Sequence, residues 1–213
     1  MSQKDLEILW NKTICIAGAR NQGKTNLAQY LTLVHLAPIC DLIILFGNGG
    51  SVTQWSFLTG KGMPHRVYPE IKEEVIEECF RENAQRLQKK KEPIRYLIIF
   101  DDSLSRTTIF SDAINKIFIH GRIFNICPMI LQQSVSQIHP DWRRNADYWF
   151  VAKPRTQGDY QWIYENLTVD IDNKKDAFAM IRSIPTYTFL FVDFTQGHTS
   201  VSLYKAPLIK LKN

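Results

Sequence analysis

Hydrophobic residues occur along this chain in short runs with almost no polar interruption, and longer amphipathic segments separate the runs. The apolar runs predict β-strands at 13–17, 42–46, 96–100, 126–133 and 148–152. Because these strands are apolar on both faces, they are typical of a mostly parallel sheet with helices on both sides. The expected fold is therefore α/β, with three layers in the order α/β/α.

Between these strands, apolar residues recur at steps of three to five, which predicts helices. The segments with this spacing are 26–36, 70–91 and 109–118. The second of them begins with glutamates and ends with Lys89, Lys90 and Lys91, the charge order that a helix dipole favours. We therefore assign the lysine run to a helix end and not to a DNA-binding patch.

Weaker patterns complete the predicted fold. Residues 65–68 indicate a short additional strand, and Phe46–Ser51 has the composition of a turn. Strands at 187–194 and 200–204 flank Gln196 and Gly197, which predicts a C-terminal β-hairpin. A length of 213 residues suits one domain, residues 1–213, with a core at about 12–165 and a C-terminal extension at about 166–213 that carries the hairpin.

A phosphate-binding motif follows the first predicted strand. The pattern G-x-x-x-x-G-K-[ST] is met without exception by Gly18, Ala19, Arg20, Asn21, Gln22, Gly23, Lys24 and Thr25. The glycines let successive backbone N–H groups point at phosphate oxygens, and the following helix adds its positive N-terminal end. In such a P-loop, Lys24 reaches the β- and γ-phosphates of ATP and the Thr25 hydroxyl binds Mg²⁺. The alternative is a glycine-bounded turn that only caps a helix.

Two acidic residues follow the apolar strand at 96–100, as in a Walker B motif. Asp101 is expected to hold Mg²⁺ opposite Thr25, and Asp102 to orient or deprotonate the attacking water. The alternative for Asp102 is a cap on the next helix.

The strand at 126–133 ends in Gln133, whose neutral amide is placed to sense the γ-phosphate; the alternative is an ordinary surface glutamine. A further strand, at 42–46, lies between the P-loop strand and the Walker B strand. This order favours the RecA-like branch of P-loop NTPases over folds of the nucleoside-monophosphate-kinase type.

Composition adds little to this interpretation. Hydrophobic residues make up 45% and charged residues 22%, and the net charge of +5 permits a polyanionic partner without requiring one. The four cysteines lack the spacing of a zinc site.

Residues 1–7 are polar, unlike a signal peptide, and no apolar run approaches the ~18 residues that span a bilayer. We therefore expect a cytoplasmic protein without stable membrane insertion.

Over about residues 12–165 the sequence resembles the FtsK-HerA superfamily of DNA-pumping ATPases. The resemblance rests on the P-loop, on Leu97–Asp102, and on Gly121–Gln133, in which Arg122 and Gln133 have the family's spacing. Residues 145–150 are similar to the entry to the family's next strand. The short chain, the Asp-Asp pair and the lack of a recognisable membrane or DNA-orienting domain look closest to viral genome-packaging ATPases of the poxvirus type.

The resemblance implies roles for the site residues. Lys24, Thr25 and Asp101 would hold Mg-ATP, Asp102 would act on water and Gln133 would be the sensor. Arg122 would be an arginine finger inserted into the neighbouring subunit's site within a homo-oligomeric ring. The alternative for Arg122 is a local ion pair at a helix end, and Arg143 and Arg144 also stay open as candidates for the finger.

The function expected is ATP-driven translocation of double-stranded DNA into a preformed viral capsid, with a portal-like vertex as partner. One alternative is a cellular or plasmid-borne translocase used in conjugation or segregation. The other is an assembly protein that binds ATP with negligible turnover. Candidate DNA contacts, each of which is otherwise a solvated surface charge, are Lys61, His65, Arg66, Arg143 and Arg144.

Overall fold

A computed structural model describes residues 9–104, 111–168, 171, 173–195 and 199–209. Three features expected from the sequence therefore lie outside the described residues. They are the start of the helix at 109–118, the turn at Gln196 and Gly197, and the polar segment 1–7. All other predicted elements fall within the part of the chain that the structure describes.

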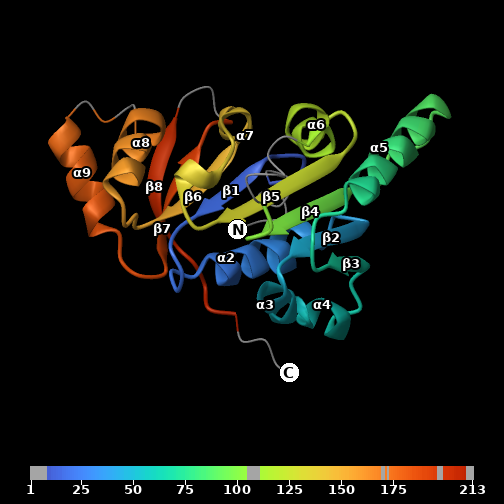
Figure 1. Ribbon diagram of the computed structural model, residues 1–213, viewed down its shortest axis with the longest axis horizontal. Helices are drawn as coiled ribbons and strands as arrows, with labels where there is room; N and C mark the ends of the chain where they lie inside the picture. Colours follow the sequence, from blue (N-terminus) through green and yellow to red (C-terminus); the bar gives the residue numbers. More distant parts are fainter. Residues whose placement is uncertain (1–8, 105–110, 169–170, 172, 196–198, 210–213) are drawn as a thin grey trace.

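An eight-stranded sheet forms the centre of the molecule (Figure 1). Its strands are β1 (Ile14–Ala17), β2 (Leu42–Gly47), β3 (His65–Tyr68), β4 (Tyr96–Asp101), β5 (Ile126–Gln132), β6 (Tyr148–Ala152), β7 (Thr188–Asp193) and β8 (Ser200–Lys205). They lie in the order β3-β2-β4-β5-β1-β6-β7-β8. The first six strands of this order run parallel, and β7 and β8 add antiparallel pairings. The mostly parallel sheet and the C-terminal hairpin are thus confirmed.

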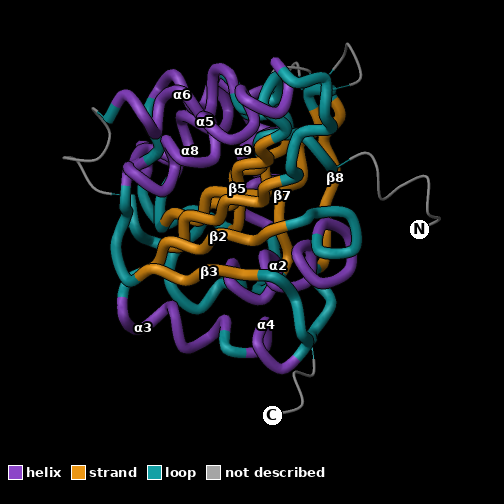
Figure 2. The backbone as a smooth tube through the Cα atoms, turned by 90° about the vertical axis from the view of Figure 1, so that its right-hand side faces the viewer, coloured by secondary structure: helices purple, strands orange, loops and turns teal. Residues whose placement is uncertain are grey.

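Helices cover both faces of the sheet (Figure 2). On one face lie α5 (Glu73–Gln88), α6 (Asp112–His120), α7 (Pro140–Arg144), α8 (Gln157–Leu167) and α9 (Lys174–Ser183). On the other face lie α2 (Lys24–Tyr30), a π-helix (Leu31–Leu36), α3 (Gly49–Val52) and α4 (Phe57–Gly60). Short 3-10 turns occur at Thr53–Trp55 and Val135–Gln137. None of the described helices is long and apolar enough to cross a membrane.

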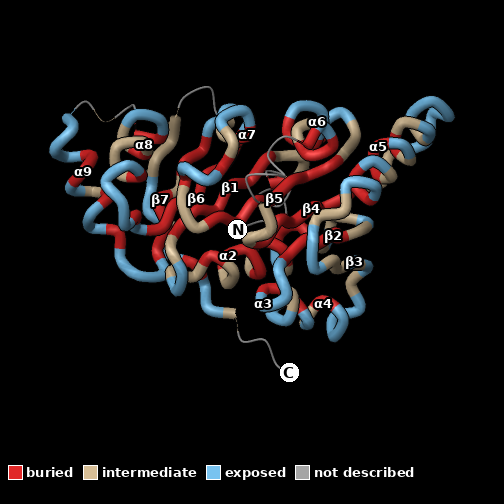
Figure 3. Tube along the Cα trace, viewed as in Figure 1, coloured by how far each residue is buried: buried red, intermediate tan, exposed pale blue. Residues whose placement is uncertain are grey.

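Strand residues alternate between two separate hydrophobic cores. Ile44 and Phe46 of β2 pack in the core beneath α5 and α6, whereas Ile43 and Leu45 pack in the core beneath α2. The central strands are accordingly buried along their whole length, while the outer faces of the helices are exposed (Figure 3). Burial on both sides explains the uninterrupted apolar runs and confirms the three-layer α/β/α fold.

Two details differ from the prediction. The strand that separates β1 from the Walker B strand β4 within the sheet is β5, whereas β2 lies on the far side of β4. The RecA-like separation therefore holds, but through a different strand. The predicted turn at Phe46–Ser51 is partly helical, because the Asn48 side chain accepts a hydrogen bond from the Ser51 N–H at 3.3 Å and caps α3.

Candidate nucleotide site

The predicted P-loop connects β1 to α2 at the carboxyl edge of the parallel strands. Gly18 lies so close to β6 that an added Cβ would stand 2.6 Å from the Cβ of Ala152, and its N–H donates to the carbonyl of Gln132 at 3.1 Å. Gly23 precedes α2 with φ +88°, a left-handed conformation that glycine adopts without strain. Both motif glycines are therefore required by the backbone.

Lys24 is largely buried at the start of α2, with 7% of its surface exposed. Its Nζ donates to the carbonyl of Ala19 at 3.4 Å, across the loop. Burial lowers the pKa of Lys24, and the nearby carboxylates of Asp102 and Asp101 oppose that shift. A cation held in this way at the positive end of a helix is suited to bind an anionic phosphate chain.

The other P-loop residues complete the turn around Lys24. Arg20 and Asn21 are exposed, and Asn21 also has a left-handed backbone, with φ 63°. Oε1 of Gln22 is buried without a hydrogen-bond partner among the described residues. Thr25 is half-buried in the first turn of α2, directly after Lys24.

Asp101 ends β4 as a buried carboxylate with 2% of its surface exposed. The indole N–H of Trp55 donates to its Oδ2 at 2.9 Å. Burial raises the pKa of Asp101, and the hydrogen bond from Trp55 and the charge of Lys24 counteract the rise. Trp55 was missed by the sequence analysis, because nothing near it in the chain marks it as a partner of the Walker B acid.

Asp102 follows with a left-handed backbone, φ 49°, fixed by a hydrogen bond of 3.1 Å from its N–H to the Leu131 carbonyl. Its Oδ2 accepts from Nε2 of Gln133 at 3.4 Å, and its Oδ1 is buried without a partner in the part of the chain that the structure describes. Non-glycine residues in this region are strained and concentrate at functional sites. The cap of α6 is Ser111, whose side chain accepts from the Ile114 N–H, and not Asp102.

These residues meet at one edge of the sheet. Lys24 lies within electrostatic range of Asp101 and Asp102, and Gln133 is hydrogen-bonded to Asp102. The sequence motifs predicted that these side chains lie close together. Carboxylate and hydroxyl oxygens are the ligands that Mg²⁺ prefers. The buried, unpaired Oδ1 of Asp102 and the nearly enclosed Lys24 and Asp101 therefore fit a magnesium–nucleotide complex.

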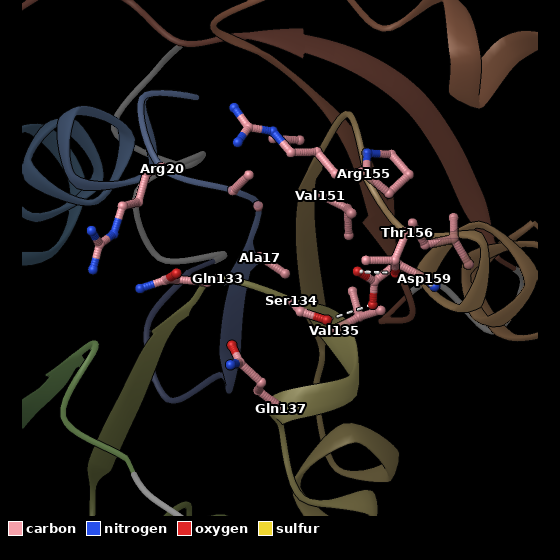
Figure 4. A pocket seen from close by; sticks show the side chains of 15 residues that line it. Ala17, Arg20, Gln133, Ser134, Val135, Gln137, Val151, Arg155, Thr156 and Asp159 are labelled. Atoms are coloured by element: carbon pink, nitrogen blue, oxygen red, sulfur yellow. Dashed lines mark hydrogen bonds between the residues drawn. The ribbon is translucent and has the colours of Figure 1, made fainter.

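A cleft of about 330 Å³ adjoins the P-loop (Figure 4). Gln133 and Arg20 line one side of it, and Arg155 lines the other. At its far wall the buried Asp159 accepts hydrogen bonds from Ser134 at 2.5 Å and from Thr156 at 2.9 Å, which tie the end of β5 to α8. No local pattern in the sequence predicts this network.

Arg122 lies before β5 and therefore at the opposite end of the parallel strands from the P-loop. Its guanidinium donates to Asp147, whose other carboxylate oxygen accepts from the Thr13 N–H at 2.8 Å. The Arg122 side chain is 56% exposed. In the single chain Arg122 thus makes the local ion pair that was its alternative, and its action on a neighbouring subunit stays a prediction.

The candidate DNA contacts near β3 have mixed surroundings. Lys61 is exposed after α4. His65 Nδ1 lies 2.6 Å from the carbonyl of Met63, and Arg66 pairs with Glu78 at 3.8 Å. His65 and Arg66 thus have local partners, and Lys61 and Arg66 both have the exposure that a DNA contact requires.

The second candidate group lies at the end of α7, on the sheet face that α5 and α6 also cover (Figure 1). The guanidinium of Arg143 lies 4.9 Å from the ring centre of Trp162, and burial lowers its pKa. Arg144 is exposed and bonds to Asp141 at 3.1 Å. Arg144 therefore keeps its charge at the surface, while Arg143 packs on an aromatic ring.

Solved structures share this architecture. The genome packaging NTPase B204 from Sulfolobus turreted icosahedral virus 2, in complex with sulfate, superposes with a TM-score of 0.67 at 19% identity, covering 92% of this chain and 97% of that one. The fold is that of a P-loop ATPase. The conjugation coupling protein TcpA of pCW3, with ATPγS, gives a TM-score of 0.66 at 15% identity over 93% of this chain and 61% of that one. Both likenesses confirm the P-loop NTPase fold that the sequence predicts.

A relative is also found by sequence. It is "Uncharacterized protein 015R" of Frog virus 3 (isolate Goorha), 24% identical over 205 residues, which cover 92% of this chain and 62% of that protein. The chain thus spans about three fifths of the relative's length. No protein-family model matches the sequence.

Proposed function

We propose that this chain hydrolyses ATP to move double-stranded DNA, and that the DNA is a viral genome entering a preformed capsid. The observation that carries the proposal is the meeting of Lys24, Asp101, Asp102 and Gln133 at one sheet edge, in the fold of a genome packaging NTPase. B204 is matched over 97% of its length and TcpA over 61%. This difference in the matched share of the two proteins, together with a relative in a virus, favours genome packaging over conjugation.

The residues divide the chemistry among them. The N–H groups of the P-loop and the Lys24 ammonium bind the phosphates, and Thr25 and Asp101 hold Mg²⁺. A magnesium ion held by these two residues would supply positive charge to neutralise the charge that develops on the phosphates during hydrolysis. The cytoplasm of the host cell supplies both ATP and Mg²⁺.

Asp102 accepts the proton of the attacking water as the new oxygen–phosphorus bond forms and the bond from the γ-phosphorus to the bridging oxygen breaks, which yields ADP and phosphate. Gln133, bonded to Asp102, orients that carboxylate and senses loss of the γ-phosphate. In the proposed ring, Arg122 acts on the site of a neighbouring subunit; its half-exposed side chain at the other end of the strands supports this role.

Phosphate release by the purified chain, with and without linear duplex DNA, tests the proposal. We expect Mg²⁺-dependent turnover that duplex stimulates, and a stimulation that falls steeply with salt because phosphate contacts dominate non-specific DNA binding. Lys24→Ala should abolish turnover, whereas Lys175→Ala, an exposed lysine of α9, should leave it unchanged. If the chain binds ATP but does not hydrolyse it, it would instead be a nucleotide-gated assembly protein. ATP hydrolysis that duplex DNA does not stimulate would contradict the proposed DNA motor.

A further inference from the structure

Tyr187, at the entry to β7, lies directly against the P-loop. A Cβ added to Gly23 would stand 2.7 Å from Cδ1 and 3.5 Å from Cε1 of this ring. The tyrosine is nonetheless 45% exposed, so part of its ring faces solvent beside the phosphate-binding turn. An aromatic ring from the C-terminal extension thus lies against the predicted P-loop.

The backbone of Tyr187 is held in a conformation that a large side chain rarely adopts. Its φ is 59°, in the left-handed region, where a bulky residue is strained. The Tyr187 carbonyl accepts from the Ala206 N–H at 3.2 Å, and the Thr188 N–H donates to the Pro185 carbonyl at 3.2 Å. The hairpin therefore fixes the strained residue with its ring on the P-loop.

A second contact holds the C-terminal segment at the same place. Asn26, the residue after Thr25, donates from Nδ2 to the Pro207 carbonyl at 2.9 Å and accepts at Oδ1 from the Ile209 N–H at 3.3 Å. The chain after β8 accordingly runs beside α2 before it reaches the C-terminus (Figure 1). Two independent tethers thus join the C-terminal extension to the first turn of the P-loop helix.

We propose that Tyr187 is the surface on which the base of the bound nucleotide stacks. The inference rests on the proposed binding of ATP at the P-loop. Phosphates held between Gly18 and Thr25 leave the sugar and base to emerge beside the start of α2, where Tyr187 is exposed. Every base has a π-face that stacks on an aromatic ring, so this contact binds nucleoside triphosphates with little preference between bases.

Removing the ring without disturbing the backbone tests the proposal. Tyr187→Gly suits this purpose because glycine adopts a φ of 59° without strain. Titration calorimetry would compare two probes, Mg-ATP and Mg-tripolyphosphate, which lacks a base. We expect roughly 5- to 150-fold weaker ATP binding, the range that loss of one base–aromatic stack gives, and unchanged tripolyphosphate binding. Tyr187→Phe should bind ATP like the parent.

Controls separate stacking from a structural role. Leu203→Ala, an exposed residue of the same hairpin, should leave both affinities unchanged. If Tyr187→Gly fails to fold, Tyr187→Asn removes the ring with another residue that tolerates the left-handed region. If Tyr187→Gly weakens the binding of both probes equally, the ring only shapes the P-loop. If ATP binding is unchanged, the ring does not touch the base. Either result overturns the inference. A parent that binds neither probe, or a Lys24→Ala variant that binds both like the parent, would overturn the proposed function as well.

Discussion

Replacing Trp55 by phenylalanine removes the hydrogen bond that the indole N–H donates to Asp101 and leaves the rest of the site in place. Asp101 is 2% exposed, and the distance from Trp55 Nε1 to Oδ2 is 2.9 Å. Burial already raises the pKa of this carboxyl, and the indole opposes the rise by stabilising the charged form. Without the indole, the pKa of Asp101 rises further.

The size of the effect follows from the bond type. A hydrogen bond to a charged group contributes about 1.5–3 kcal/mol. Because Trp55→Phe removes this stabilisation of the ionised carboxylate, the pKa of Asp101 should rise further in the variant. Because Asp101 must be ionised to hold Mg²⁺, hydrolysis fails as pH falls through this pKa, and it should fail at a higher pH in the variant.

The assay is kcat/KM for ATP hydrolysis across a pH series. The acid limb of the profile should move to higher pH in Trp55→Phe. On that limb kcat/KM should fall by about 10- to 150-fold, the equivalent of the lost hydrogen bond, and the activities should converge at high pH. Trp142→Phe is the matched control, since Trp142 is equally buried and donates at 2.7 Å to the neutral amide of Asn115. An acid limb that stays in place in Trp55→Phe, or moves as far in the control, would refute the assignment of Asp101 as the metal-holding acid.

Three further predictions concern other parts of the site. Asp102→Asn should bind Mg-ATP but hydrolyse it about 10²–10⁴-fold more slowly in single turnovers, since an amide cannot accept the proton; equal loss of binding would give Asp102 a structural role. Arg122→Ala should bind ATP normally and hydrolyse it about 10³–10⁵-fold more slowly, with turnover partly restored by mixing it with Asp102→Asn; a co-assembled mixture that stays inactive would contradict the trans finger. Gly18→Ala should lower the free energy of unfolding by about 1–3 kcal/mol in urea, because the new Cβ meets Ala152, whereas Gly49→Ala, with no atom within 4 Å, should cost little.

The sequence predicted the parts of the fold and site that local chemistry determines. Parallel strands buried on both faces need uninterrupted apolar runs, and a phosphate-binding turn needs Gly18, Gly23 and Lys24 at fixed spacing. Both requirements can be recognised from residues that lie close together in the sequence. The core strands, the glycine-bounded turn after β1 and the position of the Asp101–Asp102 pair at the end of β4 were therefore predicted without a structure.

Contacts between distant segments leave no such mark. Trp55 reaches Asp101 only because α3 and the following 3-10 turn fold over the end of β4, and Tyr187 reaches Gly23 only through the hairpin. The pairing of Arg122 with Asp147 likewise depends on how β5 and β6 flank β1. Tertiary structure alone decides these contacts, and the strand that separates β1 from β4 was misassigned for the same reason.

Coupling of hydrolysis to movement along duplex DNA is the central claim, and displacement of a third strand measures it directly. A labelled oligonucleotide bound as a triplex near one end of a linear duplex is removed by a protein that moves along that duplex. We predict ATP- and Mg²⁺-dependent displacement by the parent chain and none by Lys24→Ala. Duplex-stimulated hydrolysis that leaves the third strand in place would contradict the account.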